Sequence, residues 1–245
     1  MEWLYGRQVV ATALGAGARR RPSRLAATPA ALHALAARLP AHLDVDTVDD
    51  RELERLTRSS EHQGAAVLVG DYPYVSPDEL LAADLVVVLD EISDPHNLGA
   101  VARSALAAGA GGLVVPRHRA AHVTPAAVKA SAGTLELLPV AVVPNVVAFL
   151  KQAKKAGLWV YGAAGDAPRP YVELDLCDRS VLVFGSEGRG LRPLVARACD
   201  GLATIPMEPA VESLNVSVAA AVFLFEARRQ RAAAPPTAAP PAAAP

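Results

Sequence analysis

The chain has 245 residues, a formal net charge of −1 and a hydrophobic fraction of 52%. This length allows one large domain or two modest ones with a sizeable core, and the near-neutral charge excludes a global basic field for nucleic acid. Cys177 and Cys199 have neither CxxC spacing nor ligand-spaced histidines, which indicates free, buried thiols in a reducing compartment. The sequence shows no signal-peptide pattern or membrane-spanning apolar run, so we expect a cytoplasmic protein without a membrane partner.

The first 72 residues predict a small α/β domain. Their apolar patterns indicate helices over 6–14, from Pro29 and over 51–58, and strands over 25–28, 43–48 and 65–69. An arginine cluster is expected in an exposed loop before the first of these strands and comprises Arg19, Arg20, Arg21 and Arg24. Residues 73–84 are the predicted linker and entry helix, which opens with a capping box of Ser76 and Glu79.

A second domain is predicted over 85–231. Apolar runs of strand length alternate there with helical patterns, which indicates a parallel sheet with helices on both faces. Strands are expected over 85–89, 112–115, 140–143, 158–161, 181–184 and 202–205, and helices over 99–108, from Thr124, over 145–156, over 191–198 and from about 213–215. The last helix is nearly all apolar, so it should be buried. Residues 232–245 contain only Ala, Pro and one Thr, which is typical of a disordered tail.

Three stretches with unusual polar chemistry occur in this domain, at 97–103, 185–190 and 205–219. Because ligands bind at the carboxyl ends of parallel strands, we expect the three stretches to form one site. The glycine-rich turn at 185–190 permits close backbone approach but matches neither a dinucleotide nor a Walker loop. Within it Glu187, taken alone, is more simply a solvated charge. Arg103 stands in a mostly apolar helix, so an acidic or phosphate partner is expected.

The six histidines indicate neither a metal site nor a nucleophile–base pair. Their spacing matches no ligand pattern, and the chain has no HExxH or GxSxG sequence. We therefore expect no metal, and His96 is interpreted as an ordinary loop residue.

Together the three stretches resemble the motifs of the SpoU/TrmH family, the RNA 2′-O-ribose methyltransferases of the SPOUT class. The first motif is matched by Asn97, Gly99 and Arg103, the second by Gly185, Ser186, Glu187, Gly188 and Gly190, and the third by Ile205, Pro206, Met207, Ser213, Leu214, Asn215, Ser217 and Ala219. A small intermediate motif of the family is matched by Lys129, Ser131, Gly133 and Glu136, with Thr134 where alanine is commoner. The sequences Tyr5-Gly6 and His62-Gln63-Gly64 resemble the branch that methylates a guanosine of 23S rRNA.

The resemblance implies a trefoil-knotted parallel sheet, a homodimer with its site near the dimer interface, S-adenosylmethionine as cofactor and RNA as substrate. Backbone and side chains at Gly185, Glu187, Gly188, Ile205, Met207 and Leu214 would bind the cofactor. The implied catalytic residues are Asn97, Arg103, Glu187, Ser213 and Asn215, and the implied RNA contacts are Arg19, Arg20, Arg21, Arg24 and Arg103. A guanidinium is a poor base, so we expect Arg103 to grip a phosphate and stabilise alkoxide charge instead.

Several alternatives remain open from the sequence. Within the family, a transfer RNA or an antibiotic-resistance adenosine of ribosomal RNA is the rival target. A non-catalytic RNA-binding factor for ribosome assembly is a rival of another class, and a nucleotide-binding metabolic enzyme would need a dinucleotide loop that the chain lacks. The sequence also leaves open the modified nucleotide, the general base and whether free RNA or a ribosomal particle is the substrate.

Overall fold

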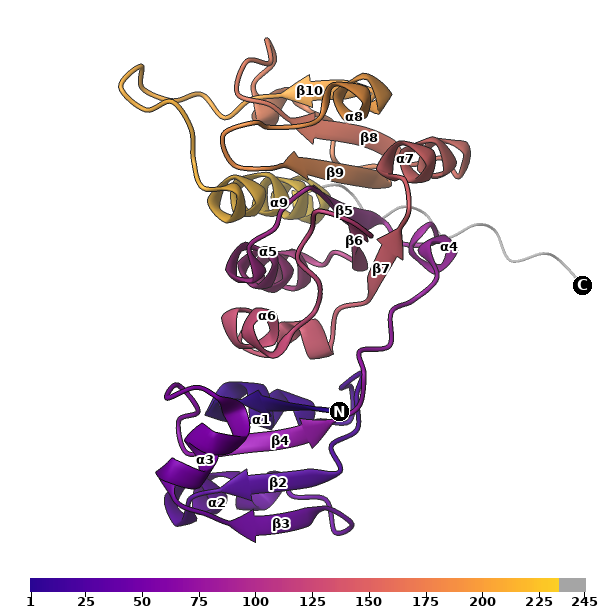
Figure 1. The fold of residues 1–245 in the computed structure, drawn as a ribbon. Coiled ribbons are helices and arrows are strands. Elements are labelled where there is room, and N and C mark those ends of the chain that lie inside the picture. Colours follow the sequence, from indigo (N-terminus) through magenta and orange to yellow (C-terminus); the bar gives the residue numbers. More distant parts are fainter. Residues whose placement is uncertain (234–245) are drawn as a thin grey trace, which may run out of the picture.

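The computed structural model describes residues 1–233. The chain forms two sheets, one in residues 2–69 and one in residues 85–203, with the N-terminal unit below the larger unit in Figure 1. Most of the tail predicted over 232–245 lies outside the described residues. Its first two residues, Ala232 and Ala233, instead end the last helix.

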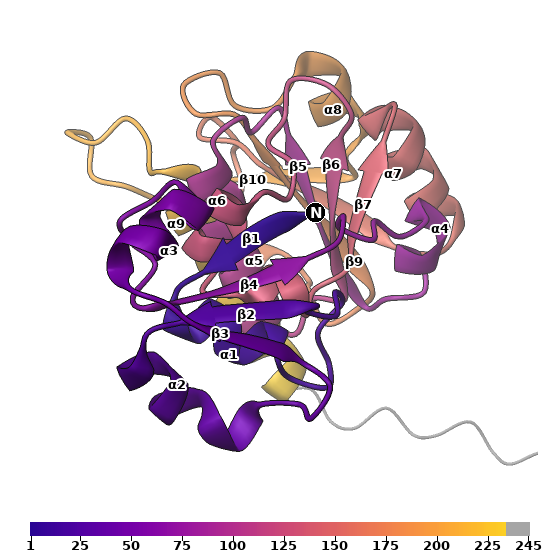
Figure 2. The same cartoon turned by 60° about the horizontal axis from the view of Figure 1, so that its bottom comes forward.

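The N-terminal unit is a four-stranded sheet in the order β1-β4-β2-β3 (Figure 2). Its strands are β1 (Glu2–Tyr5), β2 (Arg24–Ala27), β3 (Asp44–Thr47) and β4 (Ala65–Val69), and its helical segments are α1 (Arg7–Ala13), α2 (Pro29–Leu35), η1 (Ala36–Arg38) and α3 (Asp50–Thr57). Thr28 caps α2 and Asp49 caps α3, because each side chain accepts from a first-turn N–H. Strand β1 has no counterpart among the predicted elements; it pairs antiparallel with β4.

The larger unit is a six-stranded parallel sheet in the order β10-β8-β9-β5-β6-β7. Its strands are β5 (Leu85–Asp90), β6 (Gly112–Pro116), β7 (Val140–Val143), β8 (Trp159–Ala163), β9 (Ser180–Gly185) and β10 (Gly201–Ala203). Its helical segments are α4 (Pro77–Leu80), α5 (Pro95–Ala108), α6 (Pro125–Ala130), η2 (Thr134–Glu136), α7 (Val146–Lys155), η3 (Tyr171–Glu173), α8 (Pro193–Ala198) and α9 (Val216–Ala233).

Helices cover both faces of this sheet, as the sequence predicts. Every residue of the central strands β5 and β9 is buried. Along β5, Val87 and Leu89 join a core with α5, α6 and α9, whereas Val86 and Val88 join a core with α7 and α8. Side chains of a strand alternate between its two faces, so this division shows that each core lies on one side of the sheet.

The order of the strands creates a switch point between β5 and β9. The chain runs outward from β5 to β6 and β7, crosses to β8, and returns with β9 to pair with β5. The loops after β5 and β9 therefore lead away to opposite sides, which is where parallel sheets bind ligands. The trefoil knot implied by the resemblance stays a prediction.

Helix α5 begins earlier than the sequence pattern predicts. Asp94 Oδ1 accepts from the N–H of His96 at 2.8 Å, so Pro95 is the first helical residue. Pro fits this position because its missing N–H would be unpaired there anyway. The shift places Asn97 inside the first helical turn, with its side chain fixed by a helix instead of a loop.

Candidate active site

The second and third motifs meet the first in a polar cluster of Asn97, Glu187 and Asn215. Asn97 Nδ2 donates to Glu187 Oε1 at 3.0 Å. Asn215 Nδ2 donates to the same carboxylate oxygen at 2.6 Å and to Asn97 Oδ1 at 3.0 Å. Residues from three separate segments thus fix one another, which confirms the expectation that the stretches converge on one site.

Each member of the cluster is held by a different local structure. Asn97 lies in the first turn of α5 and is 8% exposed. Glu187 lies in the turn after β9, where Gly188 and Gly190 have φ of 76° and 64°, a region open mainly to glycine. Asn215 precedes α9 and its Oδ1 accepts from the N–H of Ser217 at 2.9 Å, as a helix cap does.

Asn215 therefore has two tasks. Its Oδ1, which also accepts from the Ser217 hydroxyl at 2.6 Å, is occupied at the helix end. This leaves Nδ2 facing Asn97 and Glu187, so the cap also determines the orientation of the amide. The sequence predicts that this helix begins at about 213–215, and in the structure Asn215 is the residue that caps it.

A cavity of about 520 Å³ lies beside this cluster, a volume in the usual range of cofactor pockets. Its walls come from the end of β9, the segment after β10 and the start of α9. All six predicted cofactor-binding residues line it, namely Gly185, Glu187, Gly188, Ile205, Met207 and Leu214. Phe184, Val216 and Phe223 supply apolar wall, and Ser213, predicted as catalytic, also lines the cavity.

Backbone groups at this cavity are suited to a ligand. Among the hydrogen bonds within residues 1–233, the N–H groups of Ile205 and Leu214 donate to no carbonyl and to no side chain. Both residues are partly buried, and buried N–H groups normally find a partner. A polar ligand with acceptor atoms, such as an adenine ring or a carboxylate, would satisfy both.

An ion pair that the sequence did not suggest holds the second motif in place. Asp90, buried at the end of β5, accepts from the Arg192 N–H at 3.1 Å and from its Nε and Nη2 at 2.9 and 2.6 Å. This pair ties the loop after β9 to β5 and raises the pKa of the Arg192 guanidinium. The signal in the sequence that could have indicated this ion pair is an acidic residue, Asp90, at the end of an otherwise apolar strand. The turn is also tight, because a Cβ on Gly185 would lie 2.1 Å from the carbonyl carbon of Gly190.

Arg103 lies on α5 and is exposed. The sequence predicts an acidic or a phosphate partner for it, and within residues 1–233 Arg103 forms no ion pair with an acidic side chain.

The predicted RNA-binding arginine cluster does not form one exposed loop. Arg20 is 4% exposed and pairs with Glu2 and the buried Glu136, so its assignment to RNA is wrong: the guanidinium is occupied. Arg19 is half-buried and donates to the carbonyl of Pro73 at 3.2 Å. Two exposed members remain, Arg21, and Arg24 paired with Asp46.

The described residues bring together no group of three or more His, Cys, Asp or Glu side chains that could hold a metal ion. None of the helices within residues 1–233 combines the length and the apolar character that crossing a membrane requires.

Comparison with known proteins agrees with this geometry. Residues 84–225 match the SpoU rRNA Methylase family, and residues 3–75 match the family described as RNA 2'-O ribose methyltransferase substrate binding. The chain therefore belongs to the SpoU methylase family, whose cofactor is S-adenosylmethionine.

Named relatives and solved structures extend the match over both units. The 23S rRNA (guanosine-2'-O-)-methyltransferase RlmB of Xanthomonas campestris is 42% identical over 196 residues, covering 77% of this chain and 79% of that protein. An uncharacterized tRNA/rRNA methyltransferase of Synechocystis is also 42% identical, and the chain spans only 52% of its length. The SpoU methyltransferase AviRb of Streptomyces viridochromogenes, solved with AdoMet, has a TM-score of 0.78 and 26% identity, with 94% of this chain and 90% of that chain covered.

Proposed function

We propose that this protein transfers the methyl group of S-adenosylmethionine to a ribose 2′-hydroxyl of RNA, and that the target is a guanosine of 23S rRNA. The observation that carries the proposal is the bonded cluster of Asn97, Glu187 and Asn215 at the edge of the cavity. Membership of the SpoU family supports the reaction, and the relative named as a 23S rRNA guanosine methyltransferase supports the target.

The six cavity residues named above would hold the cofactor, which supplies a methyl group already activated by its sulfonium. The N–H groups of Ile205 and Leu214 would donate to its polar atoms, and the apolar wall at Phe184 and Phe223 would cover its uncharged parts. The Glu187 carboxylate would favour the positive sulfonium over the neutral product. Retention of the substrate cofactor and release of the product would both follow from that difference.

The remaining task is to place the 2′-hydroxyl, whose oxygen would form the new bond to the methyl carbon as the carbon–sulfur bond breaks and whose proton would pass to solvent. Positioning of two reactants can contribute about 7–11 kcal/mol to lowering a barrier. In our proposal Asn97 and Asn215 hold the Glu187 carboxylate, Ser213 contributes a hydroxyl at the rim, and Arg103 binds the phosphate of the target nucleotide and stabilises the developing alkoxide. Arg103 is exposed and available for that contact.

The domain division follows the same proposal. Residues 1–72 would bind the RNA substrate, 73–84 would link and enter the second domain, and 85–231 would carry the reaction. Arg21 and Arg24 are the exposed members of the cluster that would contact phosphates. The work of the protein on RNA, together with its free cysteines, supports a cytoplasmic location.

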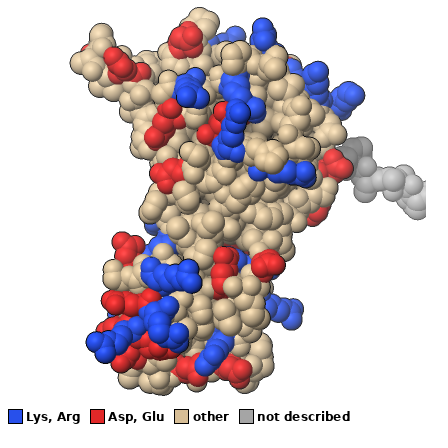
Figure 3. Space-filling view, viewed as in Figure 1, with Lys and Arg blue, Asp and Glu red and all other residues tan. Residues whose placement is uncertain are grey.

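We further propose that the protein is a homodimer whose interface includes α9. Two large apolar side chains on α9, Val218 and Phe225, are each 49% exposed and lie two helical turns apart on one face. The sequence predicts that this helix is buried, but within a single chain this part of it is exposed. Figure 3 shows few charged side chains over the region where α5, α6 and α9 lie in Figure 1, and interface cores are depleted in charge. Sedimentation of wild type and Phe225→Arg tests this interface. We expect a dimeric wild type and a monomeric variant, and a variant that remained dimeric would refute the role of α9.

The deciding experiment uses tritiated S-adenosylmethionine, purified protein, and ribosomal and transfer RNA from a strain that lacks the gene. Label in one guanosine ribose of 23S rRNA is the expected result. Label only in transfer RNA, or in an adenosine, would retain the reaction and refute the target. Absence of cofactor binding in calorimetry would refute the enzyme and favour an assembly factor.

A further inference from the structure

Three short motifs that the reaction does not use meet where the two units touch. The intermediate motif begins in α6 with Lys129, whose Nζ donates to the Glu61 carbonyl at 2.8 Å and lies 5.8 Å from the centre of the Tyr5 ring. Both partners belong to the N-terminal unit. Tyr5 is part of the Tyr5-Gly6 motif, and Glu61 directly precedes the His62-Gln63-Gly64 motif. Gln63 Oε1 in turn accepts from the N–H of Arg7 at 3.2 Å, so the residue that follows Tyr5-Gly6 is bonded to the other N-terminal motif.

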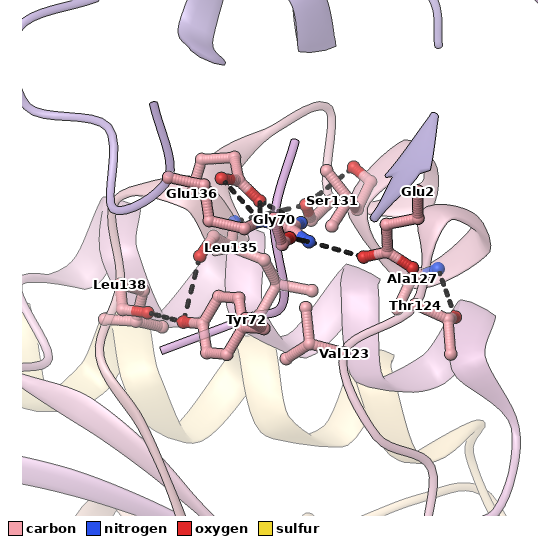
Figure 4. Close-up of polar contacts among 12 residues, drawn as sticks. Glu2, Gly70, Tyr72, Val123, Thr124, Ala127, Ser131, Leu135, Glu136 and Leu138 are labelled. Carbon is pink, nitrogen blue, oxygen red and sulfur yellow. Dashed lines mark hydrogen bonds and ion pairs between the residues drawn. The ribbon is translucent and has the colours of Figure 1, made fainter. Parts of the chain in front are cut away.

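The other end of the intermediate motif carries a fully buried charge. The Glu136 side chain is 0% exposed, and it accepts from Arg20 Nη2 at 2.5 Å and from Nε at 3.1 Å. Arg20 also bonds to Glu2 and donates to the Gly70 carbonyl at 3.3 Å. Figure 4 shows Glu2, Gly70 and Glu136 converging between the two units.

The end of the N-terminal unit, after β4, closes over this ion pair. The Tyr72 hydroxyl shares its single proton between the carbonyls of Leu138 at 2.8 Å and Leu135 at 3.1 Å (Figure 4). Its ring centre lies 5.4 Å from the Arg20 guanidinium carbon. Burial raises the pKa of Tyr72, so its hydroxyl remains a donor across the physiological range. Bonds from Tyr72 to the larger unit restrict the relative movement of the two units.

Motif glycines allow the two units and the site to pack backbone against backbone. A Cβ on Gly133, which has φ of 90°, would lie 3.0 Å from Thr12 Cβ and 3.2 Å from Val9 Cα in α1. A Cβ on Gly99 would lie 2.5 Å from the Ala127 carbonyl oxygen in α6. Helix α6 thus touches the N-terminal unit through Lys129 and touches α5, the helix that carries Asn97, at Gly99.

We propose that Arg20, Glu136 and Lys129 are positioning residues that hold the N-terminal unit at a fixed place relative to the cluster of Asn97, Glu187 and Asn215. This inference rests on the proposed function: RNA held by residues 1–72 would then present one ribose to the cavity. A buried ion pair adds little stability over an apolar pair, but loss of one partner leaves a buried charge that favours opening. The ion pair therefore fixes the position of one unit relative to the other and adds little to the strength of their contact.

The test uses Arg20→Met, which leaves Glu136 unpaired and should loosen the contact between the two units. We expect faster chymotrypsin cleavage after Tyr72 and a larger radius of gyration by X-ray scattering. The kcat on ribosomal RNA should fall at least about tenfold, because misplacement by an ångström can cost far more. The Kd values for RNA and S-adenosylmethionine should stay within about twofold of wild type, which a general folding defect would not allow.

Two further variants complete the design. Lys129→Met keeps the buried pair and covers the case in which Arg20→Met does not fold; it should lower kcat in the same direction. Lys154→Met removes an ion pair with Asp200 inside the larger unit and should leave kcat unchanged.

If Arg20→Met loosened the contact between the two units but kept the wild-type kcat, the positioning role would be refuted. A protein as compact and protease-resistant as wild type would refute the role of the ion pair. If the wild-type chain methylates no RNA, the proposed function fails, while the scattering and cleavage results still decide whether these residues hold the units together.

Discussion

Asn215 offers the sharpest test of the proposed site, because it supports both the helix and the cluster. In Asn215→Ala, α9 loses its first-turn cap, which costs about 1 kcal/mol of stability. The cluster loses the donor at 2.6 Å to Glu187 and the one at 3.0 Å to Asn97. A hydrogen bond to a charged group is worth about 1.5–3 kcal/mol. If that energy orients Glu187 for the reaction, kcat should fall by about 10- to 150-fold.

Asn215→Asp separates the two effects. A carboxylate can still accept from the Ser217 N–H, so the thermal stability should return to nearly that of wild type. It cannot donate to Glu187, and it places a second negative charge beside that carboxylate, so kcat should remain low.

The assay is single-turnover methyl transfer at saturating cofactor, with thermal unfolding and calorimetric cofactor binding measured in parallel. An Asn215→Asp enzyme with wild-type turnover would refute the claim that Asn215 orients Glu187. If Asn215→Asp were as unstable as Asn215→Ala, the capping assignment would be wrong instead.

Three other predictions concern single positions. Arg103→Lys should keep measurable activity because a positive charge remains near the phosphate; an inactive variant with normal cofactor and RNA binding would contradict charge stabilisation. Gly185→Ala should abolish cofactor binding in calorimetry, since its Cβ would lie 2.1 Å from the carbonyl carbon of Gly190, and unchanged affinity would contradict this. Burial raises the pKa of Cys199 to about 12, and the thiolate is the reactive form, so iodoacetamide at pH 8 should label the exposed Cys177 first by mass spectrometry; equal labelling would refute the burial argument.

Local signals in the sequence predicted much of the fold. Continuous apolar runs predicted the buried strands of the larger sheet, and short polar residues before proline predicted that helices begin near Thr28, Ser76 and Thr124, each of which caps a helix in the structure. These features depend on residues within about one helical turn, so they can be recognised without the tertiary structure. The residues that line the cavity were predicted in a different way, from the resemblance of the three stretches to the motifs of a known family.

What the tertiary structure alone decided depends on partners far apart in the chain. Strand β1 is only four residues long, and its pairing with β4 joins residues more than sixty positions apart. Because Arg19 and Arg21 flank it, the local sequence suggests that Arg20 is a surface arginine. Its partner is the buried carboxylate of Glu136, which lies 116 residues away and is neutralised by the Arg20 guanidinium. Asp90 and Arg192 are 102 residues apart. A side chain's local sequence determines the backbone around it, but burial and counter-charge come from whichever segments the sheet order brings together.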